Sequence, residues 1–298
     1  YQAMIKQNII PQTFDSSLLK NQHLIVDALL GTGLKGQLRP NYQHVIAGIN
    51  AFVSGESPGV GVLSLDIPSG LESDTGYRGS IAIKATRTLT FIALKLGQFT
   101  GSARACCGIV DVDYLGIDKK YRQQFTVAAW MNDADALINS LPKRSKVSHK
   151  GLHGHLLLVG GDYGFGGAIL MSAIAAARTG VGRLTILTRE AHVAPILSQC
   201  PEAMIRSISG AEDPMVKKIL ANVDAVVIGP GLGQGEWGIG LLDVIVAADI
   251  PLLIDADALN ILSSQEKSND HWVMTPHPGE ASRLLGVDIS DIEKDRYS

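Results

Sequence analysis

The chain has few cysteines, no long hydrophobic run and almost no excess of either charge. Cysteine accounts for 3 of 298 residues, Cys106, Cys107 and Cys200, and their positions fit neither a disulfide framework nor the spacing of a zinc site. No apolar run approaches the roughly 20 residues of a transmembrane helix. Lys and Arg number 26 against 29 Asp and Glu, which does not favour nucleic acid or an anionic membrane as a partner. We expect a soluble, cytoplasmic, enzyme-sized protein.

Short apolar runs, in contrast, are frequent, and they alternate with longer helical segments. The runs are continuous, which is typical of parallel strands covered on both faces. Residues 168–180 carry an apolar stripe at helical spacing and end in Gly180, where a C-cap glycine would stand. Alternation of strands and helices predicts an α/β protein with doubly wound parallel sheets. The predicted strands are 24–28, 61–65, 88–92, 109–112, 155–159, 184–187, 225–228, 251–254 and 272–274.

The character of the sequence changes between about residues 116 and 150. Residues 118–124 are charged and polar, and residues 141–148 are basic without a core pattern. Such stretches are typical of a linker between domains. We therefore predict two αβα domains, residues 1–122 and 123–298.

The most informative stretch is Thr-Pro-His-Pro-Gly-Glu at 275–280, which follows a short apolar run. The apolar run before that one ends in Asp255 and Asp257. Carboxyl ends of parallel strands face the ligand crevice, and the two prolines stiffen the backbone, so the pattern predicts a pre-formed small-molecule site. The structural alternative is a helix N-cap at Asp257 and an ordinary turn at the prolines.

Two acids follow strands in the first half of the chain. Asp27 ends one apolar run and precedes a glycine-rich turn, and Asp66 ends the next run, close to Ser69. Carboxylates, a hydroxyl and exposed carbonyls form an oxygen-rich pocket suited to a hard cation, and a second carboxylate can move a proton or hold a ribose or amide group. The glycines let backbone N–H groups approach a phosphate. A plain tight turn is the alternative, because the turn lacks the full dinucleotide fingerprint.

Residues 26–33, 65–71 and 108–117 resemble the NAD(P)H-hydrate epimerase domain, which has a Rossmann-like fold. The similarity covers residues 20–117, although the family's upstream Asn- and Gly-rich segment is absent. It implies that Asp27 and Ser69 bind a potassium ion and that Asp66 is catalytic, contacting the reacting end of the hydrated cofactor. It also implies that the cofactor lies along Gly31, Thr32, Gly33, Leu34, Lys35, Gly36 and Gln37.

Two glycine-rich turns follow strands in the second half, at 164–168 and 229–233. Such a turn before a helix binds anions through free N–H groups and the helix dipole; close packing of helix on strand is the alternative. Together with residues 149–151, 177–182, 201–202, 255–260 and 275–280, they resemble the ADP-dependent NAD(P)H-hydrate dehydratase of the ribokinase-like superfamily. The resemblance implies that Ala168, Gly231 and His277 contact the hydrated cofactor.

The order of the two domains is similar to that of the bifunctional NAD(P)H-hydrate repair enzymes. Such enzymes interconvert the R and S forms of hydrated NAD(P)H, called NAD(P)HX, and dehydrate the S form with ADP, releasing AMP and phosphate. The resemblance implies ADP or ATP as phosphoryl donor, a potassium ion, Mg²⁺ and a homo-oligomer. No Gly-Thr-Gly-Asp or Gly-Ser-Gly-Asp loop of the kind that binds the family's nucleotide occurs. We therefore expect a chain truncated at both ends and impaired in activity.

Two other readings remain open. A ribokinase-like kinase acting on a vitamin precursor would share the glycine loops, but not residues 275–280 behind an epimerase-like domain. A nucleotide-binding fragment without activity would bind the cofactor and not turn it over. An oxidoreductase fits poorly, because no complete dinucleotide fingerprint is present.

Overall fold

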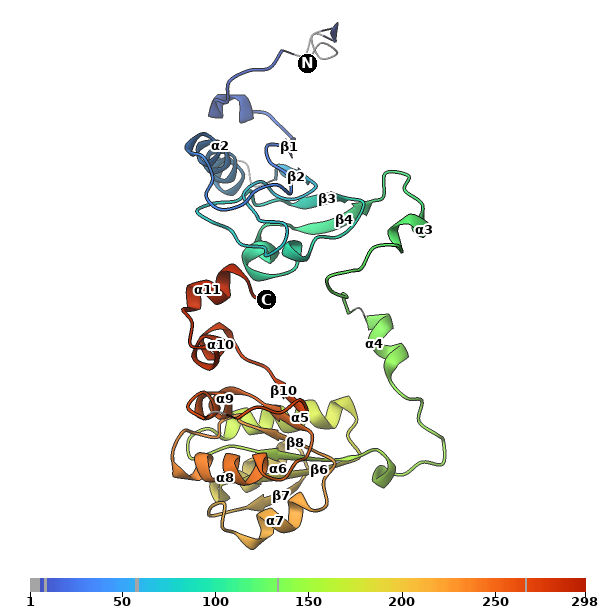
Figure 1. Ribbon diagram of the computed structural model, residues 1–298, viewed down its shortest axis with the longest axis vertical. Helices are drawn as coiled ribbons and strands as arrows, with labels where there is room; N and C mark the ends of the chain where they lie inside the picture. Colours follow the sequence, from blue (N-terminus) through green and yellow to red (C-terminus); the bar gives the residue numbers. More distant parts are fainter. Residues whose placement is uncertain (1–5, 8–9, 57–58, 133, 266) are drawn as a thin grey trace. The chain divides into compact units, whose positions relative to one another are not determined.

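The structure is a computed structural model that describes residues 6–7, 10–56, 59–132, 134–265 and 267–298. It divides into two compact units: Tyr1–Asp133 together with Ser290–Ser298, and Ala134–Ile289. Each unit is built on a parallel sheet (Figure 1). The domain assignment 1–122 and 123–298 stays a proposal.

The first unit contains a parallel sheet in the order β1-β2-β3-β4 among the described residues. Helix α2 begins with Pro40 at its first position, where the missing N–H of proline costs no hydrogen bond. Its residues Ile46 and Ile49 pack against Val62 of β2 in one apolar cluster. The elements are η1 (Ser16–Leu19), β1 (Leu24–Asp27), α2 (Pro40–Ala51), η2 (Phe52–Glu56), β2 (Gly61–Leu65), β3 (Arg87–Phe91), η3 (Leu96–Gln98), η4 (Gly101–Ala105), β4 (Ile109–Asp113) and α3 (Lys119–Arg122).

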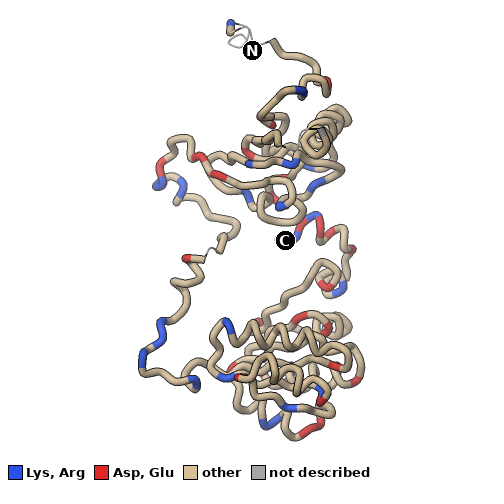
Figure 2. The backbone as a smooth tube through the Cα atoms, turned by 180° about the vertical axis from the view of Figure 1, so that it is seen from behind, with Lys and Arg blue, Asp and Glu red and all other residues tan. Residues whose placement is uncertain are grey.

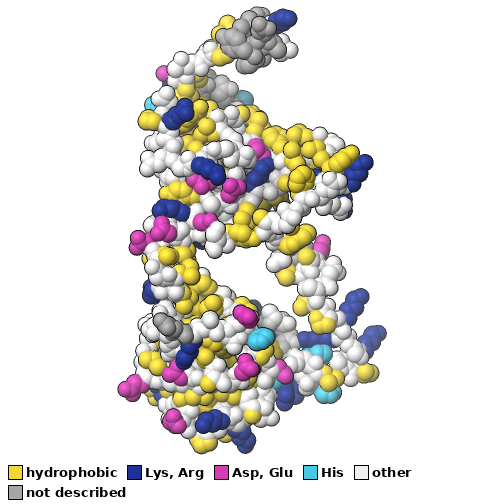
Figure 3. All heavy atoms as spheres, viewed as in Figure 1, with side chains coloured by type: hydrophobic (Ala, Val, Ile, Leu, Met, Phe, Trp, Pro, Cys, Tyr) yellow, Lys and Arg dark blue, Asp and Glu magenta, His cyan; other side chains and the backbone are white. Residues whose placement is uncertain are grey.

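The two faces of this first sheet differ in burial within the described part of the chain. Successive strand residues point to opposite faces; Val62 and Thr88 are fully buried on one face, whereas Leu24, Val26 and Ile109 are more than half exposed on the other. Apolar side chains are accordingly visible at the surface of this unit (Figure 3). The continuous apolar runs thus mean that both faces of this sheet carry apolar side chains, although the described residues cover only one face.

The second unit contains a parallel sheet in the order β10-β9-β8-β5-β6-β7. The chain winds from β5 outward to β7 and then returns to β8 on the other side of β5. Its elements are α4 (Ala134–Ser140), η5 (Lys150–Leu152), β5 (His155–Val159), α5 (Gly166–Thr179), β6 (Arg183–Thr188), α6 (Glu190–Gln199), β7 (Met204–Ser207), α7 (Pro214–Leu220), β8 (Ala225–Ile228), α8 (Glu236–Val246), β9 (Leu252–Ile254), α9 (Ala256–Leu262), β10 (Trp272–Met274) and α10 (Pro278–Leu285); α11 (Ile289–Lys294) follows.

Both faces of the second sheet are covered. Leu157 of β5 belongs to an apolar cluster with residues of α7, α8 and α9. Its neighbour Leu158 points the other way, into a cluster with Ile169 of α5 and Ile196 of α6. Full burial of such a side chain contributes about 1.5–3 kcal/mol, so the two clusters fix the three-layer αβα arrangement predicted for this half. The predicted C-cap is also confirmed, because Gly180 adopts the left-handed conformation with φ +93°.

The segment between α4 and β5 is basic and makes little structure of its own. Figure 2 shows Lys and Arg gathered along it, which matches the composition of residues 141–150. Within the described residues, no helix combines the length and apolarity that crossing a membrane requires.

Candidate active sites

Asp27 stands at the carboxyl end of β1 and is almost fully buried, with 1% of its surface exposed. Oδ1 accepts a hydrogen bond from Ser69 Oγ at 2.6 Å, and Oδ2 accepts from Ser69 N and from Ser64 Oγ, each at 2.8 Å. Ser69 Oγ in turn accepts from Leu30 N at 2.9 Å. The structure therefore brings the two predicted metal ligands, Asp27 and Ser69, into direct contact.

The donor set of this cluster consists of oxygens, the atoms that bind hard alkali and alkaline-earth cations. Asp27 Oδ1, Ser69 Oγ and the carbonyl oxygen of Leu30 lie together, with 3.4 Å between the last two. Each carboxylate oxygen is already used by hydrogen bonds within the protein. Because carboxylate and hydroxyl oxygens have more than one lone pair, these oxygens fit a potassium ion by their chemistry while keeping their hydrogen bonds.

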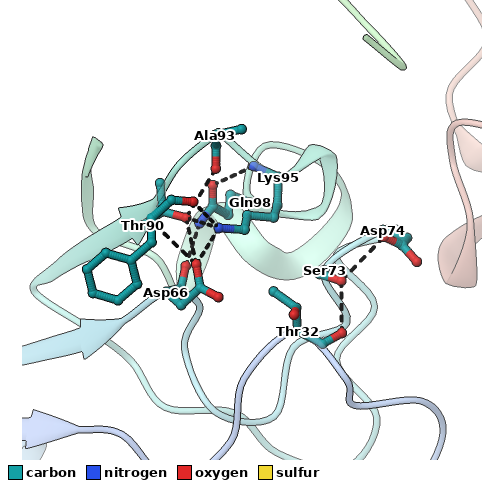
Figure 4. A network of polar contacts seen from close by, with 9 residues as sticks. Thr32, Asp66, Ser73, Asp74, Thr90, Ala93, Lys95 and Gln98 are labelled. Atoms are coloured by element: carbon teal, nitrogen blue, oxygen red, sulfur yellow. Dashed lines mark hydrogen bonds and ion pairs between the residues drawn. The ribbon is translucent and has the colours of Figure 1, made fainter. Parts of the chain in front are cut away.

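Asp66 follows β2 and adopts a left-handed backbone with φ +68°, a conformation that Asp tolerates better than most residues. Its N–H donates to Leu89 O at 2.8 Å, and Gln98 Nε2 donates to its carbonyl oxygen at 2.8 Å. Figure 4 shows its carboxylate pointing toward Thr90 and Lys95. These contacts hold a strained residue in place at the edge of the sheet.

Oδ1 makes every contact that the structure describes for the Asp66 carboxylate. It pairs with Lys95 Nζ and accepts from Thr90 Oγ1 and Phe91 N, both at 3.2 Å. Lys95 Nζ also donates to Thr90 Oγ1 at 2.7 Å and Phe91 O at 2.9 Å. Burial raises the pKa of Asp66, but these hydrogen bonds and the Lys95 charge outweigh it and lower the pKa. Asp66 is thus an ionised carboxylate whose Oδ2 is available to a ligand.

The glycine-rich loop after β1 borders a cavity of about 430 Å³. Of the predicted cofactor contacts, Gly31, Gly33, Leu34, Lys35 and Gln37 line this cavity. Thr32 O instead accepts from Ser73 Oγ at 3.1 Å (Figure 4), and Gly36 N donates to Glu72 Oε1 at 2.8 Å. These two hydrogen bonds hold the glycine-rich loop against Glu72 and Ser73.

Several residues of the first site escaped the sequence analysis. Arg39 and Tyr42, at the start of α2, line the same cavity, and Glu72 anchors the loop. Lys95, which pairs with Asp66, was not among the predicted site residues. A basic residue at a helix start beside a glycine-rich loop is the signal that points to Arg39.

In the second unit the structure brings Ala168 and Gly231 together. Gly231 has φ +62°, and a Cβ added there would lie 2.6 Å from Phe165 O and 3.3 Å from Ala168 Cβ. Its carbonyl accepts from Asp162 N at 2.7 Å. Only glycine allows this close approach of the loop after β8 to the start of α5, and the two glycine-rich turns therefore form one continuous surface.

His277 caps helix α10. Its Nδ1 accepts from Gly279 N at 3.0 Å, and its N–H donates to Glu280 Oε2 at 2.8 Å. The ring remains 63% exposed, with Nε2 3.3 Å from Glu280 Oε1. Ala168, Gly231 and His277 line neither the cavity of the first unit nor the cavity that Arg189 and Trp237 border in the second unit. Their assignment as cofactor contacts stays a proposal.

The alternative prediction of a helix N-cap at Asp257 is wrong. The N-cap of α9 is Asp255, and Asp257 lies in the first turn. Asp257 Oδ2 accepts from Gly233 N at 3.0 Å, while Asp255 Oδ1 accepts from Thr275 Oγ1 at 2.9 Å. The acids therefore connect the loops after β8, β9 and β10. At the prolines, a capped helix start replaces the ordinary turn.

The fold defines an α/β protein of two compact units, of which the second is ribokinase-like. Residues 2–97 match the family described as YjeF-related protein N-terminus, and residues 156–298 match NAD(P)H-hydrate dehydratase. The structure of a ribokinase-like superfamily protein from Enterococcus faecalis is similar, with a TM-score of 0.51 and 29% identity over 56% of this chain and 61% of that one. For an ADP/ATP-dependent NAD(P)H-hydrate dehydratase from Bacillus subtilis the TM-score is 0.47, at 33% identity over 54% and 58% of the two chains.

Curated relatives match both halves at once. The bifunctional NAD(P)H-hydrate repair enzyme of Coxiella burnetii is 42% identical over 284 residues, 95% of this chain and 57% of that protein. The Escherichia coli enzyme of the same name is 44% identical over 92% of this chain and 51% of its own length. The chain is thus similar over nearly its whole length to the bifunctional NAD(P)H-hydrate repair enzymes. It spans about half the length of the curated relatives it matches.

Proposed function

We propose that this chain acts in the repair of hydrated nicotinamide cofactors. The first unit epimerises R- and S-NAD(P)HX, and the second dehydrates the S form to NAD(P)H at the expense of ADP or ATP. The observation that carries the proposal is the joint match of both halves, in the same order, to relatives named for this activity. The alternative of a vitamin-precursor kinase gives no account of the first half.

The chemistry of epimerisation suits the Asp66 arrangement. Hydration places a hydroxyl on C6, the carbon bound to the ring nitrogen N1. The two epimers interconvert when the C6–N1 bond opens to an aldehyde and closes on the opposite face. Opening requires that the hydroxyl lose its proton while N1 gains one, and closing reverses both transfers. Asp66 Oδ2 is the proposed base, because its partner oxygen Oδ1 is held by Lys95, Thr90 and Phe91 N.

The residues around Asp66 position the cofactor. Gly31 to Gln37 line or support the cavity beside the loop after β1, and Lys35 and Arg39 supply positive charge for the phosphates of the cofactor. Lys95 acts through Asp66, whose carboxylate it keeps ionised. A potassium ion bound by Asp27 and Ser69 would supply a fixed positive charge near the loop; an increase in thermal stability with potassium chloride over sodium chloride, absent in Asp27→Asn, is the expected sign of that ion.

In the second unit, Ala168, Gly231 and His277 are the proposed contacts to the hydrated nicotinamide. Hydroxide is a poor leaving group, and a phosphoryl group transferred from ADP or ATP makes the C6 oxygen a good one. Mg²⁺ would bind through the nucleotide phosphates. The protein contributes positioning and backbone N–H groups that stabilise charge, and the joined glycine loops at Gly231 offer such groups.

Two assays test the proposal. Chromatography of pure R-NADHX incubated with the protein is expected to show conversion to an R/S mixture faster than in buffer. The dihydronicotinamide absorbance of S-NADHX is expected to recover only when ADP or ATP and Mg²⁺ are added. Asp66→Asn is expected to abolish epimerisation, whereas Asp113→Asn, at the end of β4, leaves it intact. Absence of both reactions from the full-length protein refutes the function.

The proposal also includes a homo-oligomer in the cytoplasm. Light scattering during gel filtration measures the mass of the assembly against the 31.7 kDa of this chain. A mass equal to that of one chain contradicts the oligomer.

A further inference from the structure

A second cavity, of about 490 Å³, lies in the second unit and is used by none of the proposed contacts. Its volume falls within the ~300–1,000 Å³ typical of small-molecule sites. The residues that line it are Asp162, Arg189, Ser209, Gly210, Ala211, Gly235, Glu236 and Trp237. They follow β5, β6, β7 and β8 at the carboxyl edge of the parallel sheet, the edge where open α/β sheets bind ligands. We call this space the Glu236 cavity.

Arg189 forms a rigid wall of the Glu236 cavity. Its Nε donates to Asp162 Oδ1 at 2.7 Å and its Nη1 to Ser209 O at 3.1 Å. The guanidinium lies 4.3 Å from the centre of the Trp237 ring system and 4.8 Å from that of Tyr163. Only 17% of the side chain is exposed. An arginine held by two hydrogen bonds between two aromatic rings is already committed, and it is poorly placed to clamp a further phosphate.

Glu236 is in the opposite situation. It is exposed, lies at the first position of α8, and forms no hydrogen bond or ion pair with any residue that the structure describes. With Asp162 already paired to Arg189, Glu236 gives the cavity one unbalanced negative charge and a free pair of acceptor oxygens. Such a carboxylate suits a sugar diol and repels a phosphate.

The cavity extends away from the proposed nicotinamide contacts. Ala168, Gly231 and His277 follow β5, β8 and β10, whereas the cavity, which Glu236 borders after β8, reaches beyond β5 to residues that follow β6 and β7. Neighbouring strands lie about 4.8 Å apart, so β6 lies ~10 Å from β8 and ~19 Å from β10. An extended nicotinamide dinucleotide spans a comparable distance between its two rings. The two regions are also joined directly, because Asp162 N donates to Gly231 O at 2.7 Å.

We propose that the Glu236 cavity binds the adenosine ribose of the cofactor and that Glu236 accepts hydrogen bonds from its 2′- and 3′-hydroxyls. A carboxylate that binds the ribose diol accepts a hydrogen bond from the free 2′-hydroxyl of NAD and repels the 2′-phosphate of NADP. The dehydratase unit therefore prefers the NADH form of its substrate. This inference rests on the proposed function, since it assigns a second part of the same ligand.

Titration of the full chain with NADH and with NADPH tests the assignment, because both carry the adenosine half without the hydration. Binding is measured by calorimetry and by the indole N–H resonance of Trp237 in a ¹⁵N spectrum, identified by comparison with Trp237→Phe. We expect NADH to bind at least about tenfold more tightly than NADPH, the effect of one charged hydrogen bond. Glu236→Gln is expected to bring the two affinities within about threefold, while Glu212→Gln, an exposed acid outside the cavity, leaves the ratio unchanged.

The outcomes separate the cavity from the function. If both dinucleotides bind and the ratio is the same in Glu236→Gln and Glu212→Gln, the ribose assignment is wrong and the repair function stands. The assignment is also wrong if the wild-type chain binds NADPH more tightly than NADH. It is wrong as well if calorimetry detects binding but the indole N–H resonance of Trp237 does not shift. If neither dinucleotide binds the wild-type chain, the ribose assignment and the proposed function fail together.

Discussion

Replacement of Lys95 by Met is the sharpest test of the Asp66 arrangement. Methionine keeps the length and apolar stem of lysine but removes the charge that pairs with Asp66 and donates to Thr90 Oγ1 and Phe91 O. A hydrogen bond to a charged group contributes about 1.5–3 kcal/mol. Because the Lys95 and Asp66 side chains are 18% and 26% exposed, solvent screens part of this. We expect a loss of about 2 kcal/mol in the free energy of unfolding of the first unit at neutral pH.

The pH dependence of stability follows from the direction of the Asp66 pKa shift. Burial raises the pKa of Asp66, but hydrogen bonds from Lys95, Phe91 N and Thr90 bring it below the ordinary value of 3.8. The unfolded chain therefore binds the proton more readily, so this contribution to stability is present above pH 3.8 and is lost as the pH falls through the lower folded value. In Lys95→Met burial prevails, and the pKa of Asp66 rises.

Urea denaturation followed by far-ultraviolet circular dichroism measures the loss, and the carboxyl ¹³C resonance of Asp66 measures the pKa directly. Lys84→Met is the matched control, because Lys84 is exposed and its side chain makes no hydrogen bond or ion pair in the described part of the chain. The reasoning is refuted if Lys95→Met is as stable as Lys84→Met at neutral pH, or if the pKa of Asp66 does not rise.

Three further perturbations test the scaffold. Asp27→Ala leaves buried hydroxyl and amide donors without an acceptor, and we expect the first unit to lose about 3 kcal/mol in urea denaturation; an unchanged midpoint contradicts this. Gly229→Ala would place a Cβ 1.7 Å from Asp255 O at a residue with φ +126°, so we expect the second unit to melt well below the wild-type temperature. In the control Gly167→Ala, the added Cβ meets nothing within 4 Å, and we expect the wild-type melting temperature. Burial raises the pKa of the Cys107 thiol to about 12, and Ellman's reagent at neutral pH is expected to react with it only after unfolding; rapid reaction of the folded protein counts against the burial.

The strands were the most predictable part of the fold, because continuous apolar runs identify buried parallel strands without reference to their neighbours. The run at 61–65 coincides with β2 and the run at 155–159 with β5. β7 was missed. Its sequence, Met-Ile-Arg-Ser, mixes apolar and polar residues, because an edge strand is buried on only part of its surface and only Ile205 is buried. No local pattern distinguishes such a strand from a loop.

The candidate sites were predictable in part for the same reason. Asp27 and Asp66 follow strands that neighbour each other in the sheet, so their common edge could be inferred from the sequence. The partners could not. Lys95 reaches Asp66 from a turn 29 positions later, and the approach depends on the left-handed backbone at Asp66 and Ile92. Such conformations are set by tertiary contacts and leave no signature in residue type.

Both units have residues at positive φ just after strands of their parallel sheets. In the second unit, Gly229 and Gly231 carry positive φ angles and bring backbone within contact distance of neighbouring loops. In the first unit, Asp66 has a positive φ directly after β2 and carries a side chain there. A left-handed Asp costs about 1–2 kcal/mol relative to glycine, and hydrogen bonds from Gln98 and Lys95 offset that cost. The Asp66 carboxylate projects at the edge of the sheet because the chain has Asp rather than glycine at this left-handed position.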